Sequence, residues 1–392
     1  MELGVVGKPN CGKSTFFSAC TLVDVEIANY PFTTIEANRG VTYVRVPDPG
    51  KDFGVTPNPR NSKVANGVRF VPVTILDVAG LVPGAHEGKG LGNKFLDDLS
   101  NANALVHVVD MSGGTDSEGR VVALGTHDPA SDVRFLELEL DHWIAGVLRK
   151  HWHRIESKHR MQGEKLTPLV CDALSGLHVT ENQVENALRV IPSVNAANLA
   201  EFASELRKAS KPLVIAANKM DLQGAGENLE RCRKAFPGYS FIPTAGEAEL
   251  ALRKAERAGI IRYSPGGKDF ELLRSDLPER QLKALEFVRE KVLKKYGSTG
   301  VQQVIDAAVF QLLKRIVVFP VEDEHKLSDS KGLVLPDALL LPENSTPLDL
   351  AFAIHSDIGK NFAAAYDCRK KMKVSKDAIL KTGDVVKIFA KN

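Results

Sequence analysis

The sequence predicts an α/β fold, with a doubly wound and mostly parallel sheet, a helical insertion and a smaller C-terminal β domain. The strands of the sheet are predicted by apolar runs at residues 2–6, 41–46, 69–76, 103–109, 213–217 and 239–243. Strands that alternate with helices are typical of a sheet covered on both faces. Residues 112–210 are far more than one crossover helix requires, so we expect an inserted domain there.

A glycine-rich turn follows the first predicted strand. It reads Gly7-Lys8-Pro9-Asn10-Cys11-Gly12-Lys13-Ser14, with Thr15 next, and a helix is predicted from Ser14 through Leu22. Between a strand and a helix this pattern forms a phosphate-binding loop, because backbone N–H groups and the helix N-terminus attract an anion. Lys13 is expected to reach the β- and γ-phosphates and Ser14 to bind Mg²⁺. The turn therefore predicts a P-loop NTPase that binds a nucleoside triphosphate.

Two more motifs end predicted strands. Asp77-Val78-Ala79-Gly80 offers a carboxylate that can hold Mg²⁺ through water and a glycine N–H that can meet a γ-phosphate. Asn218-Lys219-Met220-Asp221 is typical of guanine recognition, because adenine lacks the two donors that the Asp221 carboxylate would accept. Ligands of open α/β sheets bind at the carboxyl edge, where all three motifs are predicted. We therefore expect GTP and GDP as ligands.

A fifth GTPase motif is expected after the strand at 239–243. GTPases usually carry Ser-Ala there, with a backbone N–H that meets guanine O6, and this chain reads Thr244-Ala245-Gly246. Because a backbone donor survives a change of side chain, we assign these three residues to the base pocket.

The inserted segment carries a helical pattern. Apolar residues recur at a spacing near 3.6, at Val133, Leu136, Leu140, Trp143, Val147, Trp152 and Ile155. Ser131 or Asp132 is expected to cap this helix, and a second helix is predicted over 198–209. We interpret the Trp and Leu stripe as the packing seam of an antiparallel pair rather than as a ligand site.

Three segments carry a resemblance to a known family. Residues 29–35 read Asn-Tyr-Pro-Phe-Thr-Thr-Ile, residues 77–93 extend the Asp77 motif through a Gly-rich stretch, and residues 345–355 read Ser-Thr-Pro-Leu-Asp-Leu-Ala-Phe-Ala-Ile-His. They resemble the two switch regions of Obg-related GTPases of the YchF-like branch and their TGS domain, a β-grasp module. The resemblance implies an Obg-type G domain with trailing helices at 1–111 and 211–315, a coiled-coil-like helical domain at 112–210 and a TGS domain at 316–392.

The chain departs from the YchF pattern at the base-reading motif. That branch typically carries Asn-x-x-Glu and tolerates ATP, whereas this chain has Asp221. It is nearer to the archaeal and fungal relatives that keep Asn-Lys-x-Asp, which favours GTP.

The usual catalytic side chain is absent. Ras-type switches orient the attacking water with a glutamine where this chain has Leu81, so we expect slow hydrolysis. Three replacements stay open. Asn10 resembles a residue of K⁺-dependent GTPases, His86 lies in the second switch, and His107 aligns with a histidine proposed for hydrolysis in YchF-like proteins. The alternatives are that Asn10 only stabilises the loop and that His107, in an apolar strand, is a core residue.

The first switch needs a threonine that meets Mg²⁺ and the γ-phosphate. The resemblance favours Thr34 over Thr33, because YchF relatives often carry cysteine at the first of the two. The expected ligands of Mg²⁺ are therefore Ser14, Thr34 and Asp77.

Composition describes an ordinary water-soluble protein. The chain has 392 residues, 43% hydrophobic and 26% charged, and a net charge of +2 that is too small to argue nucleic-acid binding by the whole chain. Five cysteines without a C-x-x-C pair suggest reduced thiols in the cytoplasm. We expect no signal peptide, no membrane span and a monomer.

Two short segments are basic. Residues 149–165 and 369–376 each concentrate Lys and Arg, and both lie in the predicted appendages. They are either solvated faces or contacts to the phosphates of ribosomal RNA or tRNA; DNA is not expected.

Three functional classes are compatible with these features. The favoured one is a GTP-driven switch that acts on the ribosome or its RNA. The second is a nucleotide hydrolase in stress signalling that also accepts ATP, and the missing glutamine at position 81 argues against it. The third is an interaction module with vestigial nucleotide binding, against which the intact motifs argue.

Overall fold

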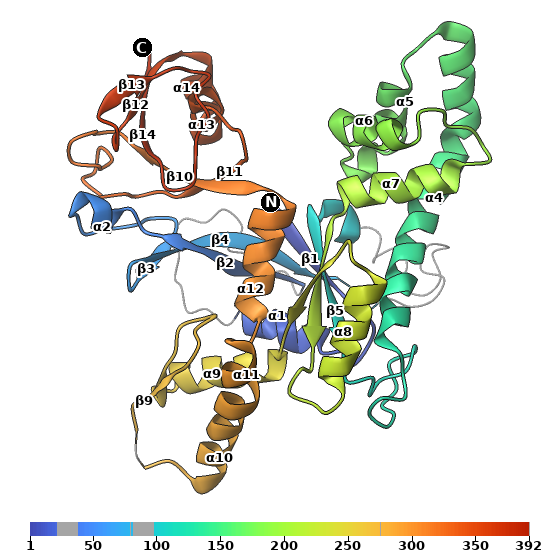
Figure 1. The fold of residues 1–392 in the computed structure, drawn as a ribbon. Coiled ribbons are helices and arrows are strands. Elements are labelled where there is room, and N and C mark those ends of the chain that lie inside the picture. Colours follow the sequence, from blue (N-terminus) through green and yellow to red (C-terminus); the bar gives the residue numbers. More distant parts are fainter. Residues whose placement is uncertain (22–37, 79, 81–97, 275, 392) are drawn as a thin grey trace. The chain divides into compact units, whose positions relative to one another are not determined.

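A computed structural model of the chain describes residues 1–21, 38–78, 80, 98–274 and 276–391 (Figure 1). These residues form two compact units. The first takes in the described residues of 1–21, 38–40 and 74–304, and the second those of 41–73 and 305–391. No helix in the described ranges is both long and apolar enough to cross a membrane.

The sheet of the nucleotide-binding motifs follows the predicted pattern. Its strands are β1 (Glu2–Val6), β2 (Arg39–Pro47), β3 (Lys63–Ala65), β4 (Val68–Asp77), β5 (Ala104–Asp110), β6 (Leu213–Asn218) and β7 (Ser240–Pro243). The order is β2-β4-β1-β5-β6-β7, and β3 pairs with β4 antiparallel. The pairs β4–β1, β1–β5, β5–β6 and β6–β7 are parallel, so their carboxyl ends meet at one edge. The predicted α/β, mostly parallel sheet is confirmed.

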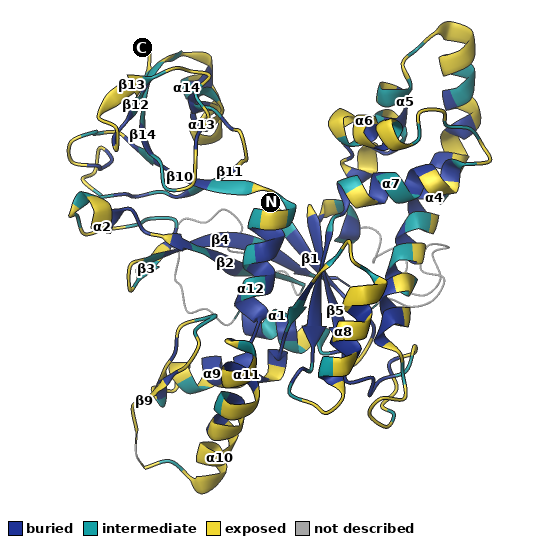
Figure 2. Ribbon diagram, in the orientation of Figure 1, coloured by how far each residue is buried: buried dark blue, intermediate teal, exposed yellow. Residues whose placement is uncertain are grey.

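The central strands are buried on both faces. Every residue of β5 and β6 is buried (Figure 2), as continuous apolar runs in a parallel sheet require. Helices α1 (Lys13–Thr21), α8 (Ala225–Ala235) and α9 (Gly246–Arg257) follow β1, β6 and β7 along the chain. This alternation places the start of a helix beside the end of each of these strands, which is the arrangement that binds anions.

The insertion is helical. It contains α4 (Pro129–Gln162), α5 (Leu166–Ala173), the 3₁₀ turn η2 (Ser175–Leu177), α6 (Glu181–Val190) and α7 (Leu199–Ser210). Trp143 and Trp152 of α4 share one hydrophobic core with Phe202 and Leu206 of α7, so the Trp and Leu stripe is a packing seam. The N-cap of α4 is Asp128, which accepts from the Ala130 N–H, rather than the expected Ser131 or Asp132.

Further elements follow α9 along the chain. They are the hairpin β8 (Ile261–Arg262) and β9 (Glu271–Leu272), α10 (Glu279–Val288), the π-helical η3 (Arg289–Leu293), α11 (Lys294–Tyr296) and α12 (Val301–Asp306). The last of them, α12, crosses from the first unit into the second at residue 305. Residues 297–300 form the turn between α11 and α12. The hairpin is absent from the sequence-based prediction.

The second unit contains the C-terminal β domain. After η4 (Ala307–Leu312) it comprises β10 (Arg315–Val321), β11 (Leu339–Pro342), α13 (Pro347–Ile354), α14 (Ser356–Lys360), β12 (Phe362–Asp367), β13 (Met372–Val374) and β14 (Val385–Ala390). The strand order is β11-β10-β14-β12-β13. Thr346 and Asp349 form a capping box at the start of α13, with Pro347 in its first turn.

Residues 41–73 belong to this second unit. They include α2 (Gly50–Phe53) and β3, and the buried Arg69 guanidinium binds Asp48, Ser62 and the Leu335 carbonyl oxygen. The domain limits predicted from the sequence group these residues with the G domain, whereas the compact units group them with the C-terminal segment.

Candidate nucleotide-binding site

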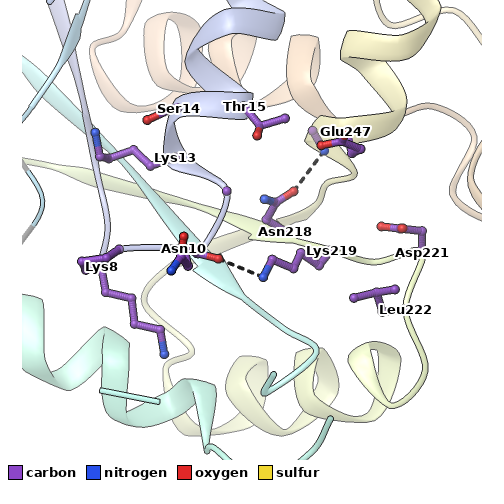
Figure 3. Close-up of a pocket in the computed structure, with 13 residues that line it drawn as sticks. Lys8, Asn10, Lys13, Ser14, Thr15, Asn218, Lys219, Asp221, Leu222 and Glu247 are labelled. Atoms are coloured by element: carbon purple, nitrogen blue, oxygen red, sulfur yellow. Dashed lines mark hydrogen bonds between the residues drawn. The ribbon is translucent and has the colours of Figure 1, made fainter. Parts of the chain in front are cut away.

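A cavity of about 500 Å³ lies at the carboxyl edge of the parallel sheet (Figure 3). It brings together the glycine-rich turn after β1, the motif that ends β6 and the start of α9. Its lining residues are Lys8, Pro9, Asn10, Gly12, Lys13, Ser14, Thr15, Asn218, Lys219, Asp221, Leu222, Gly246 and Glu247. Motifs that are two hundred residues apart in sequence thus line one pocket, as the sequence predicts.

The glycines of the turn are required by close approaches. Gly12 has φ +95°, and a Cβ there would lie 2.3 Å from the Asn218 amide nitrogen, which donates to the Cys11 carbonyl oxygen at 3.0 Å. A Cβ on Gly7 would lie 2.7 Å from the Val108 carbonyl oxygen. Cys11, within the turn, is buried, and burial raises the pKa of its thiol to about 11. Cys11 and Gly7 therefore shape the loop and do not line the cavity.

Lys13 and Asp77 form an ion pair at the phosphate end of the site. The Lys13 ammonium contacts the Asp77 carboxylate at the end of β4, and 12% and 23% of the two side chains is exposed. Both residues were assigned to the nucleotide and its metal, and the structure places them together. Phosphate oxygens entering the cavity would compete with Asp77 for the ammonium and leave the carboxylate for a cation.

The side chains of Lys8 and Asn10 hydrogen-bond to a neighbouring segment of the protein. The Lys8 ammonium donates to the Thr115 carbonyl oxygen at 2.8 Å and pairs with Asp132 at the start of α4. The Asn10 amide donates to the Gly119 carbonyl oxygen at 2.9 Å. These contacts fasten the glycine-rich turn to the segment before α4, which supports the loop-stabilising interpretation of Asn10.

The residues of the motif that ends β6 have different surroundings. The Asn218 side chain joins two loops, donating to Cys11 and accepting from the Gly246 N–H at 3.0 Å. Lys219, at φ +61°, donates to the Asn10 carbonyl oxygen and to the buried Asp110 carboxylate, both at 2.9 Å. Met220 is buried in the core, whereas Asp221 lines the cavity. Asp221 is thus the carboxylate that this motif adds to the lining of the cavity.

Asp110 anchors this arrangement from inside the sheet. Burial works to raise the pKa of its carboxyl, but hydrogen bonds from Lys219, Ser112 and Thr115 outweigh that effect and lower it. The charged carboxylate therefore holds Lys219 in place.

The loop after β7 differs from the expectation. The Ala245 N–H donates to the Thr299 carbonyl oxygen at 2.9 Å, and the Gly246 N–H donates to Asn218. Both backbone donors expected to meet guanine O6 therefore have protein partners. The Thr244 N–H likewise donates to the Ala217 carbonyl oxygen at 2.7 Å. Gly246 and Glu247, the first two residues of α9, both line the cavity.

Two lining residues were not predicted, Leu222 and Glu247. Each directly follows a residue that was assigned, so extending each motif by one position would have found them. Leu222 adds an apolar side chain to the lining, and Glu247 adds a second carboxylate besides that of Asp221.

The histidine of β5 does not line the cavity. His107 is 2% exposed, and desolvation together with the nearby Lys8 lowers its pKa to about 3. It stays neutral at ordinary pH and is not among the residues that line the cavity. The structure therefore favours the core interpretation of His107.

The remaining assigned residues belong to the two switch segments. Thr34, Ala79 and His86 lie outside the described residues. Val78 is buried, and its N–H donates to the Val5 carbonyl oxygen at 3.1 Å. Gly80 lies beside the turn, since a Cβ there would be 3.8 Å from Pro9.

The oxygen donors present suit Mg²⁺. Mg²⁺ is usually held by one or two protein oxygens together with phosphates and water, and Ser14 and Asp77 offer a hydroxyl and a carboxylate. No cluster of three or more His, Cys, Asp or Glu that could hold a metal by itself occurs among the residues with described positions. The donor set thus fits a metal that arrives with a nucleotide.

Comparisons with known proteins agree with the site. Three family models match: a 50S ribosome-binding GTPase at residues 2–136, the G4 motif-containing domain of YGR210-like Obg-like GTPases at 216–323, and a TGS domain at 331–390. The GTP-binding protein MJ1332 of Methanocaldococcus jannaschii is 48% identical, over 99% of this chain and 98% of that protein. The ribosome-binding ATPase YchF of Escherichia coli O157:H7 is 28% identical, over 98% of each chain.

A solved structure supports the same assignment. The crystal structure of a GTP-binding protein from Pyrococcus horikoshii OT3 is 42% identical, covers 100% of both chains and superposes with a TM-score of 0.81. Together with the cavity at the carboxyl edge and the C-terminal β domain, these likenesses show that the chain belongs to the Obg-like, YchF-related family of P-loop GTP-binding proteins with a TGS domain.

Proposed function

We propose that the protein binds GTP and GDP in the 500 Å³ cavity, hydrolyses GTP slowly and uses the difference between the two states as a switch. The observation that carries this proposal is that Lys13 and Ser14 line the same cavity as Asp221. The first two suit phosphates and a metal, and the third suits the donors of guanine. We further propose that Ser14, Thr34 and Asp77 hold Mg²⁺, which neutralises phosphate charge when bound.

Calorimetric titration with GTP, GDP and ATP tests nucleotide binding. The unmodified chain should bind both guanine nucleotides, and Lys13→Ala should lose at least about a hundredfold in affinity because the phosphates lose their charge partner. Lys51→Ala, an exposed lysine of α2, is the matched control and should bind as the unmodified chain does. Full affinity in Lys13→Ala would refute the assignment of the phosphate loop.

Slow hydrolysis is proposed from the residue at position 81. Leu81 has no polar group that could orient water. Among the described residues that line the cavity there is no glutamine, and His107 is not one of them. We propose that a K⁺ ion beside Asn10 supplies the positive charge that an arginine finger provides in other GTPases. The amide nitrogen of Asn10 donates to the Gly119 carbonyl oxygen. Single-turnover rates in KCl and NaCl test this role, and equal rates would remove K⁺ from the mechanism.

The proposed partner is the ribosome or its RNA, in the cytoplasm. Support comes from the YchF relative and the 50S ribosome-binding GTPase family, whose names state ribosome binding, and from exposed basic residues on the appendages. Arg149, Lys150 and Arg154 are exposed on α4, and Lys371, Lys373 and Lys376 on the C-terminal domain. We propose that these groups contact RNA phosphates and that the protein acts as a monomer.

Cosedimentation with ribosomes tests this partner. The protein is mixed with ribosomes under a GTP analogue, GDP or no nucleotide, across a series of salt concentrations. We expect binding that depends on the nucleotide and weakens with salt. Binding that ignores the nucleotide would instead favour the second candidate, a stress-signalling hydrolase that also accepts ATP, which the ATPase name of the YchF relative makes worth testing.

The domain limits also remain a proposal: a G domain at 1–111 and 211–315, a helical domain at 112–210 and a TGS domain at 316–392. The TGS family match at 331–390 and the helices α4–α7 support the last two.

A further inference from the structure

The turn between α11 and α12 forms part of the wall behind the base-reading loop. Thr299, in this turn, accepts the Ala245 N–H on its backbone carbonyl oxygen at 2.9 Å. The next residue, Gly300, has φ +81°, and a Cβ there would lie 1.9 Å from the Pro243 carbonyl oxygen. The turn is therefore pressed against the end of β7 and the start of the loop at 244–247, about fifty residues away in sequence.

A buried carboxylate holds Thr299 in place. The Thr299 hydroxyl donates to Glu249 Oε2, which also accepts from the Tyr263 hydroxyl at 2.7 Å. Glu249 Oε1 accepts from Arg253 Nε at 2.7 Å. Glu249 and Thr299 are both 0% exposed. A carboxylate so deeply buried is tolerated only when charge and hydrogen bonds compensate it, so this cluster has one well-defined arrangement.

Two backbone donors of the loop after β7 have protein partners in this arrangement. With the Ala245 N–H on Thr299 and the Gly246 N–H on Asn218, both are already satisfied. The first N–H groups of a helix have no acceptor within the helix, and Glu247 is the second residue of α9 and lines the cavity. Glu247 thus carries the next donor along the loop.

We propose that Thr299 is a positioning residue for base recognition, and that the loop it fixes presents the Glu247 N–H to the carbonyl oxygen of a 6-oxopurine nucleotide. Guanine and hypoxanthine carry this oxygen, whereas adenine carries an amino group that cannot accept a hydrogen bond from an N–H. Asp221, which also lines the cavity, then adds the preference for guanine over hypoxanthine. The proposal rests on the proposed binding of guanine nucleotides.

Hydrogen exchange on the unmodified chain tests the donor directly. In the nucleotide-free protein the N–H groups of Ala245 and Gly246 should exchange slowly and that of Glu247 rapidly. Saturation with GDP should slow the Glu247 N–H at least about tenfold, which is the effect of a net hydrogen bond of about 1.4 kcal/mol. If GDP protects Ala245 and leaves Glu247 unchanged, the proposal is wrong.

Substitution tests the positioning role. Thr299→Val removes the hydroxyl at nearly constant volume, and we expect GDP and IDP to lose about tenfold in affinity while ADP is unaffected. Thr299→Ser keeps the hydroxyl and should restore the preference for GDP over ADP. Tyr263→Phe removes another donor from the same Glu249 oxygen and should lower the melting temperature without changing that preference.

The outcomes separate the possible causes. An unchanged preference in Thr299→Val, or an equal fall in Tyr263→Phe, would overturn the positioning role, because the effect would then come from general stability. Failure of the unmodified chain to bind GDP would instead refute the proposed function itself. The hydrogen-exchange measurement decides the question even if Thr299→Val does not fold.

Discussion

Asp221 is the side chain that we propose reads the base. All three polar residues of this motif line the cavity, but the side chains of Asn218 and Lys219 also hydrogen-bond to neighbouring loops. A carboxylate accepts from two donors of guanine, and an amide in its place would present a donor of its own to one of them. The discriminating chemistry of the motif therefore rests on one residue.

We predict that Asp221→Asn lowers the preference for GDP over ADP by at least about tenfold, because a buried donor of guanine is left without an acceptor. Competitive titration of the two nucleotides measures this ratio. IDP, which lacks the exocyclic amine, should lose less affinity than GDP does. Asp172→Asn in α5, outside the lining of the cavity, is the matched control. An unaltered ratio in Asp221→Asn would take the residue out of the site.

His107 makes the stability of the fold depend on pH. Its folded-state pKa of about 3 lies below the unfolded value, so the unfolded chain binds the additional proton at intermediate pH. Stability is therefore complete above about pH 6.5 and falls as the pH drops toward 3, by about 2 kcal/mol at pH 5 for this group alone.

Denaturant unfolding between pH 7 and pH 5 checks this prediction. His107→Leu should lose about 2 kcal/mol less over that range than the unmodified chain does. His151→Leu is the control, since His151 is exposed on α4, and its profile should match that of the unmodified chain. Identical profiles for all three would show that His107 does not bear the shifted pKa.

At the scale of elements, Arg207 ties the insertion together. Its guanidinium, 2% exposed, donates from α7 to Asp141 of α4 at 2.6 Å and also contacts Glu137. The Tyr239 hydroxyl before β7 completes the cluster, and desolvation raises its pKa to about 12. Removing the Arg207 guanidinium leaves two partly buried carboxylates without their cation.

Arg207→Met should therefore destabilise the first unit by about 3 kcal/mol, the lower end of the cost of breaking a buried ion pair, because the two carboxylates are partly exposed. Lys208→Met changes the adjacent residue, whose side chain is 55% exposed, and should cost less than about 1 kcal/mol. Chemical unfolding measures both. Equal costs would mean that the buried cluster adds nothing beyond a surface ion pair.

The elements also show what the sequence can and cannot predict. The strands, the phosphate loop and the Trp143 and Trp152 seam follow from local patterns, and the structure bears these patterns out. The cap of α4 was misplaced because Asp132 looks like a capping residue, whereas it is buried and paired with Lys8. The hydrogen bond from the Ala245 N–H to Thr299 could not be predicted from local sequence, because the two residues meet only through tertiary packing.

At the scale of the whole molecule, the cavity and residues 41–73 belong to different units. All residues that line the cavity lie in the first unit, whereas 41–73 pack with 305–391 in the second. In sequence, 41–73 lie between the two predicted switch segments. Local patterns could not reveal this grouping, because it depends on buried contacts such as that between Arg69 and the Leu335 carbonyl oxygen.

The Arg69 cluster offers a test of this organisation. Arg69 is 0% exposed and pairs with Asp48 at 2.7 Å, so Arg69→Leu leaves a buried carboxylate unpaired and should cost about 3–5 kcal/mol. GDP at a hundred times its dissociation constant should stabilise the unit that binds it by about 2.7 kcal/mol. In calorimetry, Arg69→Leu should therefore lower one unfolding transition while GDP raises another. Arg149→Leu on the exposed face of α4 should move neither. A single transition that answers to both GDP and Arg69→Leu would show instead that the two units unfold as one.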